Sequence, residues 1–318
     1  MPRYFGIDTS NYTTSMAVYD SELDVISQQK KPLPVEPGRI GLRQSDAVFS
    51  HIKQLGDVTY SLPVGHTPDA IGVSVRPRDL EGSYMPCFLA GKMAAEVLSA
   101  TLRVPLYSFS HQAGHLAAAL YGAGCMCLIE EEFLAFHMSG GTTECLHVVP
   151  GIETPFKVEI LSRSLDLFAG QLIDRVGAML NLPFPSGPYL EELAGSVSHA
   201  GAKPVFRDGN PCLSGLENQC RKQVDEKKIP SEIAAYAIVS IANIVVEMTE
   251  RALLCYPGLP VVYSGGVMSN RMIRSLVECR FSKEKIHFAP PQYSSDNAAG
   301  IAVMACRQRE KGVPSCRF

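Results

Sequence analysis

The sequence lacks the features that mark secreted, membrane-spanning and nucleic-acid-coating proteins. Its ten cysteines are scattered over 318 residues without a CxxC pair, so we expect free thiols in a reducing compartment. No uncharged apolar run reaches the roughly 18 residues that cross a bilayer, and the chain passes directly from Arg3 into a predicted strand, so we expect no signal peptide or membrane anchor. A net charge of −3 disfavours binding of nucleic acid by nonspecific attraction alone. We expect a cytoplasmic protein.

The bulk composition is that of a globular protein. Hydrophobic residues make up 46% of the chain and charged residues 19%, and the length suggests about two domains with substantial cores.

The most informative stretch is a polar turn between two apolar runs. Residues 133–136 and 145–149 are typical of paired strands, and Ser139, Gly140, Gly141 and Thr142 lie between them. Adjacent glycines expose backbone N–H groups and have no Cβ to exclude an anion, so this turn either cradles a phosphate or is an ordinary hairpin.

A second polar turn occupies the start of the chain. Residues 8–15 are dense in small polar side chains and separate strand candidates at 4–7 and 16–19, and Asp8 ends the first strand, where it can hold a metal ion or a water. Two such turns, about 130 residues apart, predict duplicated lobes that each contribute one turn to a shared cleft.

Two histidines follow a predicted helix cap. Ser110 is placed to cap a helix, and His111 and His115 follow at i, i+4, so both imidazoles point the same way. This spacing suits a divalent metal, but it also occurs in histidines with no ligand. Arg76 and Arg78 lie on a strand-to-helix loop that is either solvated or binds phosphate or nucleic acid.

The second half of the chain carries further polar groups on predicted helices. Residues 164–180 predict an amphipathic helix with Asp166, Gly170 and Asp174 along one stripe. The aspartates fit a solvated face, but Gly170 weakens a helix by roughly 1 kcal/mol and indicates close approach by another group.

The remaining predictions concern helix and loop boundaries. Gly187 belongs to a rigid turn, and Glu191 to the short helix predicted at 189–194. Residues 212–216 are expected to form a loop. The longest predicted helix, 231–254, is capped by Ser231 and faces the core. Gly265 and Gly266 lie in a strand-to-helix loop, which either binds a ligand or is simply a tight turn. Asp296 is expected to cap the last helix.

The order of these motifs resembles the TsaD family, the tRNA threonylcarbamoyladenosine synthase subunit once described as a glycoprotease, over nearly the whole chain from Gly6 to about Ala305. The matching segments are Gly6–Ser10, His111 with His115, Ser139–Thr142, the D-x-x-A-G-x-x-x-D pattern of Asp166–Asp174, Pro185–Pro188, Ser214–Leu216, Gly265–Arg271 and Ser295–Ala299.

The resemblance implies an α/β fold with two duplicated lobes of the actin/Hsp70/sugar-kinase (ASKHA) type around a nucleotide cleft. We expect an N-terminal lobe at 1–115, to which a C-terminal helix at 298–312 returns, and a second lobe at 116–297. His111, His115 and Asp296 would hold zinc or iron, with Asp8 and Ser10 completing the catalytic group. ATP or threonylcarbamoyl-AMP, with or without magnesium, would contact Ser139, Gly140, Gly141, Thr142, Asp166, Gly170, Asp174, Gly187, Glu191, Gly265, Gly266 and Asn270.

The family reaction is N6-threonylcarbamoylation of adenosine 37 in tRNA, which makes tRNA and a TsaB-like subunit, or a second copy of the chain, the expected partners. Several positions depart from the family pattern: Tyr12 and Thr13 replace two acidic residues, Thr142 replaces a histidine, Glu217 replaces a lysine, and Arg76-Pro77-Arg78 replaces Gly-Pro-Gly. These departures suggest a divergent paralogue. The alternatives are a carbamoyltransferase with another acceptor and a non-catalytic nucleotide-binding subunit; a peptidase is disfavoured because no HExxH-type base adjoins the ligands.

Overall fold

The computed structural model describes residues 2–10, 12–34, 42–63, 65–151, 154–195, 197–294 and 298–315. The chain divides into two compact units. The first comprises Met1–Ile129, Pro150–Lys157 and Gln292–Phe318, and the second comprises Glu130–Val149 and Val158–Pro291. In this division residues 116–129 group with the first unit, and so do residues 298–312.

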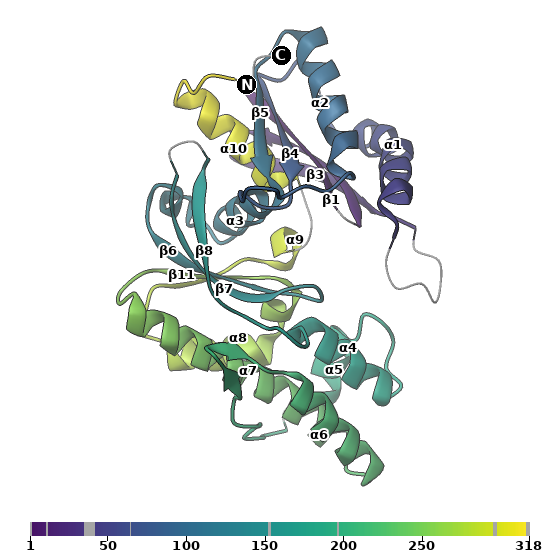
Figure 1. The fold of residues 1–318 in the computed structure, drawn as a ribbon, viewed down its shortest axis with the longest axis vertical. Helices are drawn as coiled ribbons and strands as arrows, with labels where there is room; N and C mark the ends of the chain where they lie inside the picture. Colours follow the sequence, from purple (N-terminus) through teal and green to yellow (C-terminus); the bar gives the residue numbers. More distant parts are fainter. Residues whose placement is uncertain are drawn as a thin grey trace. The chain divides into compact units, whose positions relative to one another are not determined.

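The first unit is built on a five-stranded sheet with the order β3-β2-β1-β4-β5 (Figure 1). Its first three strands run antiparallel, whereas β4 lies parallel to β1 and β5 parallel to β4. The strands are β1 (Arg3–Ser10), β2 (Thr13–Asp20), β3 (Val25–Pro32), β4 (Ala70–Arg76) and β5 (Leu106–Ser110).

Helices cover both faces of this sheet. Gly6 of β1 lies directly against the backbone of Ala298, whereas the next residue, Ile7, contacts Gly91. Successive strand residues point to opposite faces, so the last helix and the helix containing Gly91 cover opposite faces. The helices of this unit are α1 (Gln44–Tyr60), α2 (Phe88–Leu102), α3 (His111–Gly122) and α10 (Ala299–Glu310), with α1 beside α2 and α3 beside α10 (Figure 1); the short segments η1 (Met126–Glu130) and α9 (Pro291–Ser294) lie at its borders.

The second unit repeats the same strand pattern. Its sheet has the order β12-β11-β6-β7-β8, in which β6 pairs antiparallel with β7 and parallel with β11. Listed from β8 to β12, this order corresponds strand by strand to β3-β2-β1-β4-β5, so the predicted duplicated α/β architecture is confirmed. The strands are β6 (Phe133–Met138), β7 (Thr143–Pro150), β8 (Phe156–Arg163), β11 (Val261–Ser264) and β12 (Ile286–Phe288), and a separate hairpin comprises β9 (Phe206–Arg207) and β10 (Asn210–Pro211).

The core of the second unit is organised around its longest helix. The helices are α4 (Ala169–Met179), α5 (Gly187–Ala194), α6 (Ser214–Asp225), α7 (Pro230–Cys255) and α8 (Arg271–Arg280), with a short 3-10 turn, η2 (Gly266–Ser269). By length and composition α7 is apolar enough to cross a membrane, but 78% of its most apolar window is buried. Ile238, Ile241 and Val245 belong to one core cluster with Phe136 and Tyr263 of the sheet, so α7 is a core helix, as its sequence predicts.

Most predicted strands and helices are present within a few residues of the expected bounds. The exposed edge strand β3 was not predicted, because its Ser-Gln-Gln-Lys-Lys sequence lacks an apolar pattern and its pairing with β2 fixes it.

The turn within the polar segment at 8–15 is shorter than the sequence predicts. Asp8 pairs with Ser15 and Ser10 with Thr13, so most of the segment belongs to β1 and β2. Hydroxyl side chains pack across a ladder as readily as they form turns, and periodicity could not distinguish the two.

Three predicted helix boundaries were wrong. Residues 164–168 are not helical, because Asp166 Oδ1 accepts from Leu167 N at 2.6 Å and such local bonds compete with a helix. Asp166 is therefore not on one helical stripe with Gly170 and Asp174. Residues 214–216 of the predicted loop at 212–216 are instead the start of α6, and α7 begins at Pro230 after Ile229 rather than with Ser231 as its cap.

Candidate functional site

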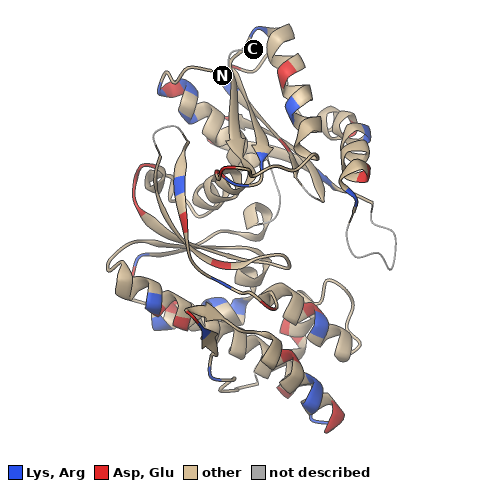
Figure 2. Ribbon diagram, viewed as in Figure 1, with Lys and Arg blue, Asp and Glu red and all other residues tan. Residues whose placement is uncertain are grey.

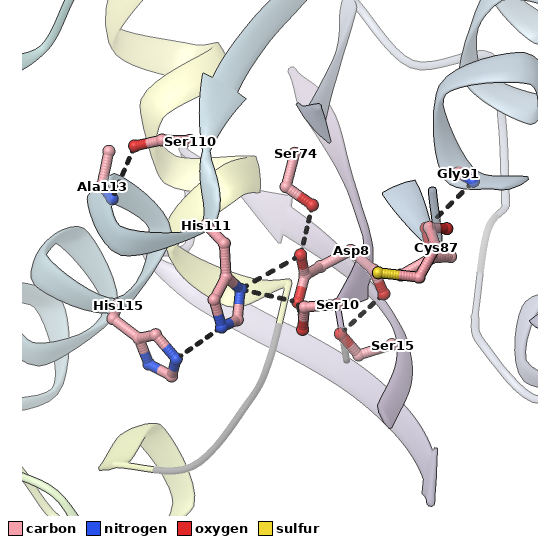
Figure 3. Close-up of polar contacts among 11 residues, drawn as sticks. Asp8, Ser10, Ser15, Ser74, Cys87, Gly91, Ser110, His111, Ala113 and His115 are labelled. Carbon is pink, nitrogen blue, oxygen red and sulfur yellow. Dashed lines mark hydrogen bonds and ion pairs between the residues drawn. The ribbon is translucent and has the colours of Figure 1, made fainter. Parts of the chain in front are cut away.

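The first unit holds a buried polar cluster centred on Asp8. This side chain is completely buried at the end of β1, and its Oδ2 accepts from Ser10 Oγ at 2.7 Å. The Ile7–Val73 register places Ser74 of β4 beside it, and the Ser74 hydroxyl donates to Oδ1. His111 Nδ1 lies 3.1 Å from Oδ2 and 3.2 Å from Oδ1 (Figure 3). Asp8 is thus fixed by three neighbours.

This environment keeps Asp8 ionised. Burial alone would raise the pKa of the carboxyl, but the attraction and hydrogen bond of His111, together with the hydroxyls of Ser74 and Ser10, outweigh it and hold the pKa below its usual value. Because a carboxylate can only accept, His111 Nδ1 carries a proton, and Nε2 is the ring nitrogen left for a metal to bind.

The two predicted metal-ligating histidines converge. His115 Nε2 lies 2.9 Å from His111 Nε2 (Figure 3), as expected for i, i+4 positions of one helix. The predicted cap is confirmed, since Ser110 Oγ accepts from Ala113 N at 3.1 Å. The same hydroxyl donates to Asp79 Oδ2 at 2.6 Å, which ties the start of α3 to the loop between β4 and α2.

Arg76, a candidate for phosphate or nucleic-acid contact, is engaged within this loop. Its Nε and Nη2 donate to Asp79 Oδ1 at 2.9 and 2.7 Å. Its charge is therefore balanced locally, and it supports Ser110 through Asp79. Arg78 donates its backbone N–H to Ser83 Oγ.

The donor set fits a divalent metal as far as it is described. Two imidazole nitrogens of one helix, one of them oriented by a buried carboxylate, are the arrangement that zinc and non-haem iron sites use. Asp296, the expected third ligand, lies outside the described residues. Among the described residues no group of three or more His, Cys, Asp or Glu side chains is placed to hold a metal.

In the second unit the predicted phosphate turn is held by neighbouring glycines. Ser139 N donates to Thr142 O at 2.7 Å, and Gly170 N donates to Ser139 O at 3.1 Å, so α4 begins directly beside the turn. A Cβ on Gly170 would lie 2.6 Å from Gly140 N, which gives the physical reason for a glycine here and matches the predicted close approach.

The glycine loop after β11 meets the same turn. Gly265 has φ +96°, and a Cβ there would collide with the backbone of Met138. By contrast, a Cβ on Gly140, Gly141 or Gly266 would have no described atom within 4 Å. Backbone amides of two loops therefore lie close together and leave space beside them, an arrangement that can accept an anionic group.

The polar side chains predicted to bind nucleotide have partners within the chain. Asp174 Oδ1 accepts from Ser186 N at 2.9 Å, just before Gly187 opens α5. Glu191 Oε1 lies 2.7 Å from Arg271 Nε, and Asn270 Oδ1 caps α8 by accepting from Met272 N and Ile273 N. Each side chain thus helps to hold the loops in place.

Asp166 also acts within the chain. Its carboxylate accepts from Leu213 N at 3.0 Å and from Ser214 N and Oγ at 3.1 and 2.7 Å, which fixes the start of α6. Partial burial would raise its pKa, but these hydrogen bonds hold the pKa well below the usual value.

Sequence patterns did not single out Ser74 or Asp79 for the site. Ser74 lies in β4 among buried apolar residues, and a hydroxyl at such a strand position was the available signal that a polar partner lay opposite. No sequence pattern links Asp79 to Ser110, because the contact depends on how the loop after β4 folds.

The fold is of the ASKHA type. The chain is similar to the full-length HypF in its phosphate- and nucleotide-bound form, with 14% identity and a TM-score of 0.61 over 98% of this chain and 56% of that one. It is also similar to component A of (R)-2-hydroxyglutaryl-CoA dehydratase from Acidaminococcus fermentans, with 16% identity and a TM-score of 0.57 over 98% and 100% of the two chains. In this chain the two lobes share one strand order.

The sequence comparisons identify a family within this fold type. Residues 67–303 match the family model described as "TsaD: tRNA N6-adenosine threonylcarbamoyltransferase". Proteins named tRNA N6-adenosine threonylcarbamoyltransferase are 27% identical in Bacillus licheniformis, over 97% of this chain and 92% of the relative, and 32% identical in Prochlorococcus marinus, over 77% and 70%. The chain belongs to the TsaD family, as its motifs predict.

Proposed function

We propose that this protein transfers a threonylcarbamoyl group from threonylcarbamoyl-AMP to N6 of adenosine 37 in tRNA, in the cytoplasm. The observation that carries the proposal is a pair of converging histidines, of which His111 is oriented by buried Asp8, in a member of the TsaD family. The names of the relatives support the same reaction.

In the proposed reaction N6 attacks the carbamoyl carbon, the new C–N bond forms, the bond to the phosphate oxygen breaks, AMP leaves and N6 releases a proton. A divalent metal held by His111, His115 and Asp296 would supply Lewis-acid polarisation of the donor carbonyl. Asp8 keeps the proton of His111 on Nδ1, and Ser10 and Ser74 hold Asp8 in place.

The turn at Ser139–Thr142 and the loop at Gly265–Gly266 would bind the AMP portion of the donor. Backbone N–H groups beside open space suit a leaving phosphate, because fixed dipoles stabilise the negative charge that develops on it. Gly170, Asp174, Gly187, Glu191 and Asn270 would shape this donor site mainly by fixing its loops, and ATP would bind in the same place.

A second candidate, transfer to a different acceptor, is favoured by one observation. Glu217, which stands where the family has lysine, lies 2.6 Å from Arg175 and 3.0 Å from Arg221. A local ion-pair cluster has therefore replaced a basic side chain, and Tyr12 and Thr13 replace the acidic pair of the first turn. The donor chemistry would be retained while the acceptor changes.

The test combines metal analysis with a transfer assay. The purified protein is assayed for zinc and iron, then incubated with threonylcarbamoyl-AMP and an unmodified tRNA, and the nucleosides are analysed by mass spectrometry. We expect near-stoichiometric metal and modified adenosine with the wild type, and loss of both with His115→Ala. His147→Ala is the matched control, because His147 is paired with Glu132 in the second unit.

The outcomes separate the candidates. AMP release that depends on His115 but leaves tRNA unmodified would replace tRNA with another acceptor. A protein without metal that neither binds nor consumes the donor would be a non-catalytic member of the family. A tRNA with guanosine at position 37 checks that the product forms at the proposed atom.

A further inference from the structure

The second unit contains a cavity that is separate from the proposed donor site. Its volume is about 550 Å³, which is in the range of sites that hold small organic molecules. Its walls are the β9–β10 hairpin with the segment that precedes it, the first turns of α6 and the middle of α7 (Figure 1). The donor-site loops, Ser139–Thr142 and Gly265–Gly266, do not line it.

Hydrogen bonds hold two walls of this cavity in place. Ala202 N donates to Ser240 Oγ at 2.8 Å, and Asn243 Nδ2 donates to Ala202 O at 3.0 Å, so the segment before β9 is fixed to α7. Arg163 N donates to Asn210 Oδ1 at 3.0 Å, which ties the hairpin to β8. The cavity is therefore built by contacts of the fold itself.

Apolar side chains form the floor and part of the rim. Leu216 of α6 and Ile244 of α7 line the cavity and belong to the core of the unit. Leu165 and Val205 also line it, but they are 69 and 56% exposed. A ligand with an apolar part would cover these exposed side chains, and the removal of apolar surface from water favours binding.

Two cationic side chains line the same cavity. Among the described residues, neither Lys203 nor Arg207 has an ion-pair or hydrogen-bond partner for its charged group. The charges of α6, where both signs alternate in Figure 2, are paired instead, as in Arg221 with Glu217 at 3.0 Å. Unpaired cations beside an apolar floor suit a ligand with an anionic head group, because charge-assisted hydrogen bonds are the strong ones.

The other polar groups of the cavity leave room for an anion. The Asp166 carboxylate accepts from the start of α6, so its charge is already stabilised by N–H and O–H donors. Asp208, at the turn of the hairpin, is then outnumbered by the two cations. Gln219 Oε1 accepts from the Tyr236 hydroxyl, which leaves its Nε2 as a further donor at the cavity.

We propose that this cavity binds a small organic acid. Lys203 and Arg207 hold its carboxylate or phosphate group, and its apolar part lies against Leu216 and Ile244. The site goes beyond the proposed transfer reaction and does not depend on it.

The first test uses two acids and a matched alcohol. The full-length protein is titrated by calorimetry with 4-phenylbutyrate, with phenyl phosphate and with the uncharged 4-phenylbutanol. We expect one acid or both to bind at a single site with a Kd of about 1 mM or tighter, and the alcohol to bind about tenfold more weakly or less. Comparison of the two acids shows whether the site prefers a carboxylate or a phosphate.

Charge-removing variants test the two cations. The double substitution Lys203→Gln and Arg207→Gln should weaken binding of the preferred acid by about tenfold or more, because it removes both charge-assisted contacts. Lys222→Gln is the matched control, because Lys222 also belongs to the second unit but is paired with Glu226 on α6, and it should leave the affinity unchanged. Circular dichroism checks that each variant is folded.

A cysteine of the cavity reports the place of binding. Cys212 lines the cavity and is partly exposed, whereas Cys255, at the end of α7, is exposed and does not line it. Alkylation of both thiols by iodoacetamide is followed by mass spectrometry. The bound acid should slow alkylation of Cys212 and leave that of Cys255 unchanged, and the double variant should lose this protection.

Four results would each overturn the proposal. They are the absence of saturable binding of both acids up to about 10 mM, equal affinity for acid and alcohol, binding that survives the double substitution, and binding that leaves the alkylation of Cys212 unchanged. The last result would assign the bound acid to another part of the molecule, such as the proposed donor site.

Discussion

The two units hold the polar groups of their candidate sites in place in different ways. In the first unit the groups are side chains: Asp8 is completely buried and is held by Ser10, Ser74 and His111. In the second unit they are backbone amides, brought together because Gly170 and Gly265 have no side chain. The first unit orients its polar side chains with buried hydrogen bonds. In the second unit the loops approach closely because the glycines have no side chain to keep them apart.

The difference matches the groups that the proposed function assigns to the two sites. A metal ion needs donor atoms at fixed positions, so its ligands must be oriented by further hydrogen bonds. An anionic group needs several N–H donors and room, which glycines supply. The carboxylates of the second unit therefore contribute by fixing loops, as Asp166, Asp174 and Glu191 do.

The largest effect is expected where the second unit depends on a missing side chain. Gly170→Ala would place a Cβ against the Ser139–Gly140 backbone, so we expect a loss of about 3 kcal/mol in unfolding free energy, measured by denaturant titration, as for overpacked cores. Gly215→Ala is the control, because its Cβ would meet open space in α6 and the change should be neutral or mildly stabilising. Equal effects of the two substitutions would remove the distinction between the glycines.

The matching test in the first unit concerns Asp8. Asp8→Asn keeps the shape but removes the charge that orients His111, so we expect zinc or iron affinity to fall by about 10–100-fold in a chelator competition. Asp69→Asn, in the same unit with its carboxylate on Arg3 N, should leave the affinity unchanged. An unaltered metal affinity in Asp8→Asn would show that the buried carboxylate does not support the histidines.

His51 tests whether buried polar groups of the first unit limit its stability. It is completely buried beside Thr14, and burial lowers its pKa to about 4, although Asp8 opposes this. The unfolded chain, with a pKa near 6.5, therefore binds more protons between these values, and stability falls as the pH drops from about 6.5 toward 4.

Because of His51, the free energy of unfolding is expected to fall by on the order of 1–2 kcal/mol between pH 7.5 and pH 5. The fall is measured as a change in the midpoint of unfolding. His51→Gln should flatten this pH dependence, whereas His66→Gln, elsewhere in the same unit, should not. A slope that survives His51→Gln would point to other groups.

The smallest effect is expected at Asp166. Asp166→Asn weakens the anchor of α6, and the loss of such a helix-start bond costs about 1 kcal/mol. Because the folded pKa of this carboxyl is lowered, its contribution is present above about pH 4 and fades as the pH falls below that value. The difference from wild type should therefore narrow in acid. Asp225→Asn, at the other end of α6, is the control.

The sequence predicted much of this architecture because the necessary signals were local. Apolar runs predicted β6 and β7, Ser110 was identified as a helix cap, and i, i+4 spacing was enough to bring His111 and His115 together. The start of α4 was predicted too early because side-chain contacts decided it. Asp166 lies before α4, where it accepts a hydrogen bond from the neighbouring Leu167 N and also anchors α6, 48 residues away.

What the sequence by itself determined is the family, the duplicated α/β pattern and the residue types of the candidate site. Those depend on motif order and on periodicities that the backbone imposes. Only the tertiary structure decided that Asp8 contacts His111, that the charge of Arg76 is balanced by Asp79, and that a glycine is required at position 170 but not at position 215. These are contacts between segments far apart in the chain, whose distances are set by sheet register and helix packing.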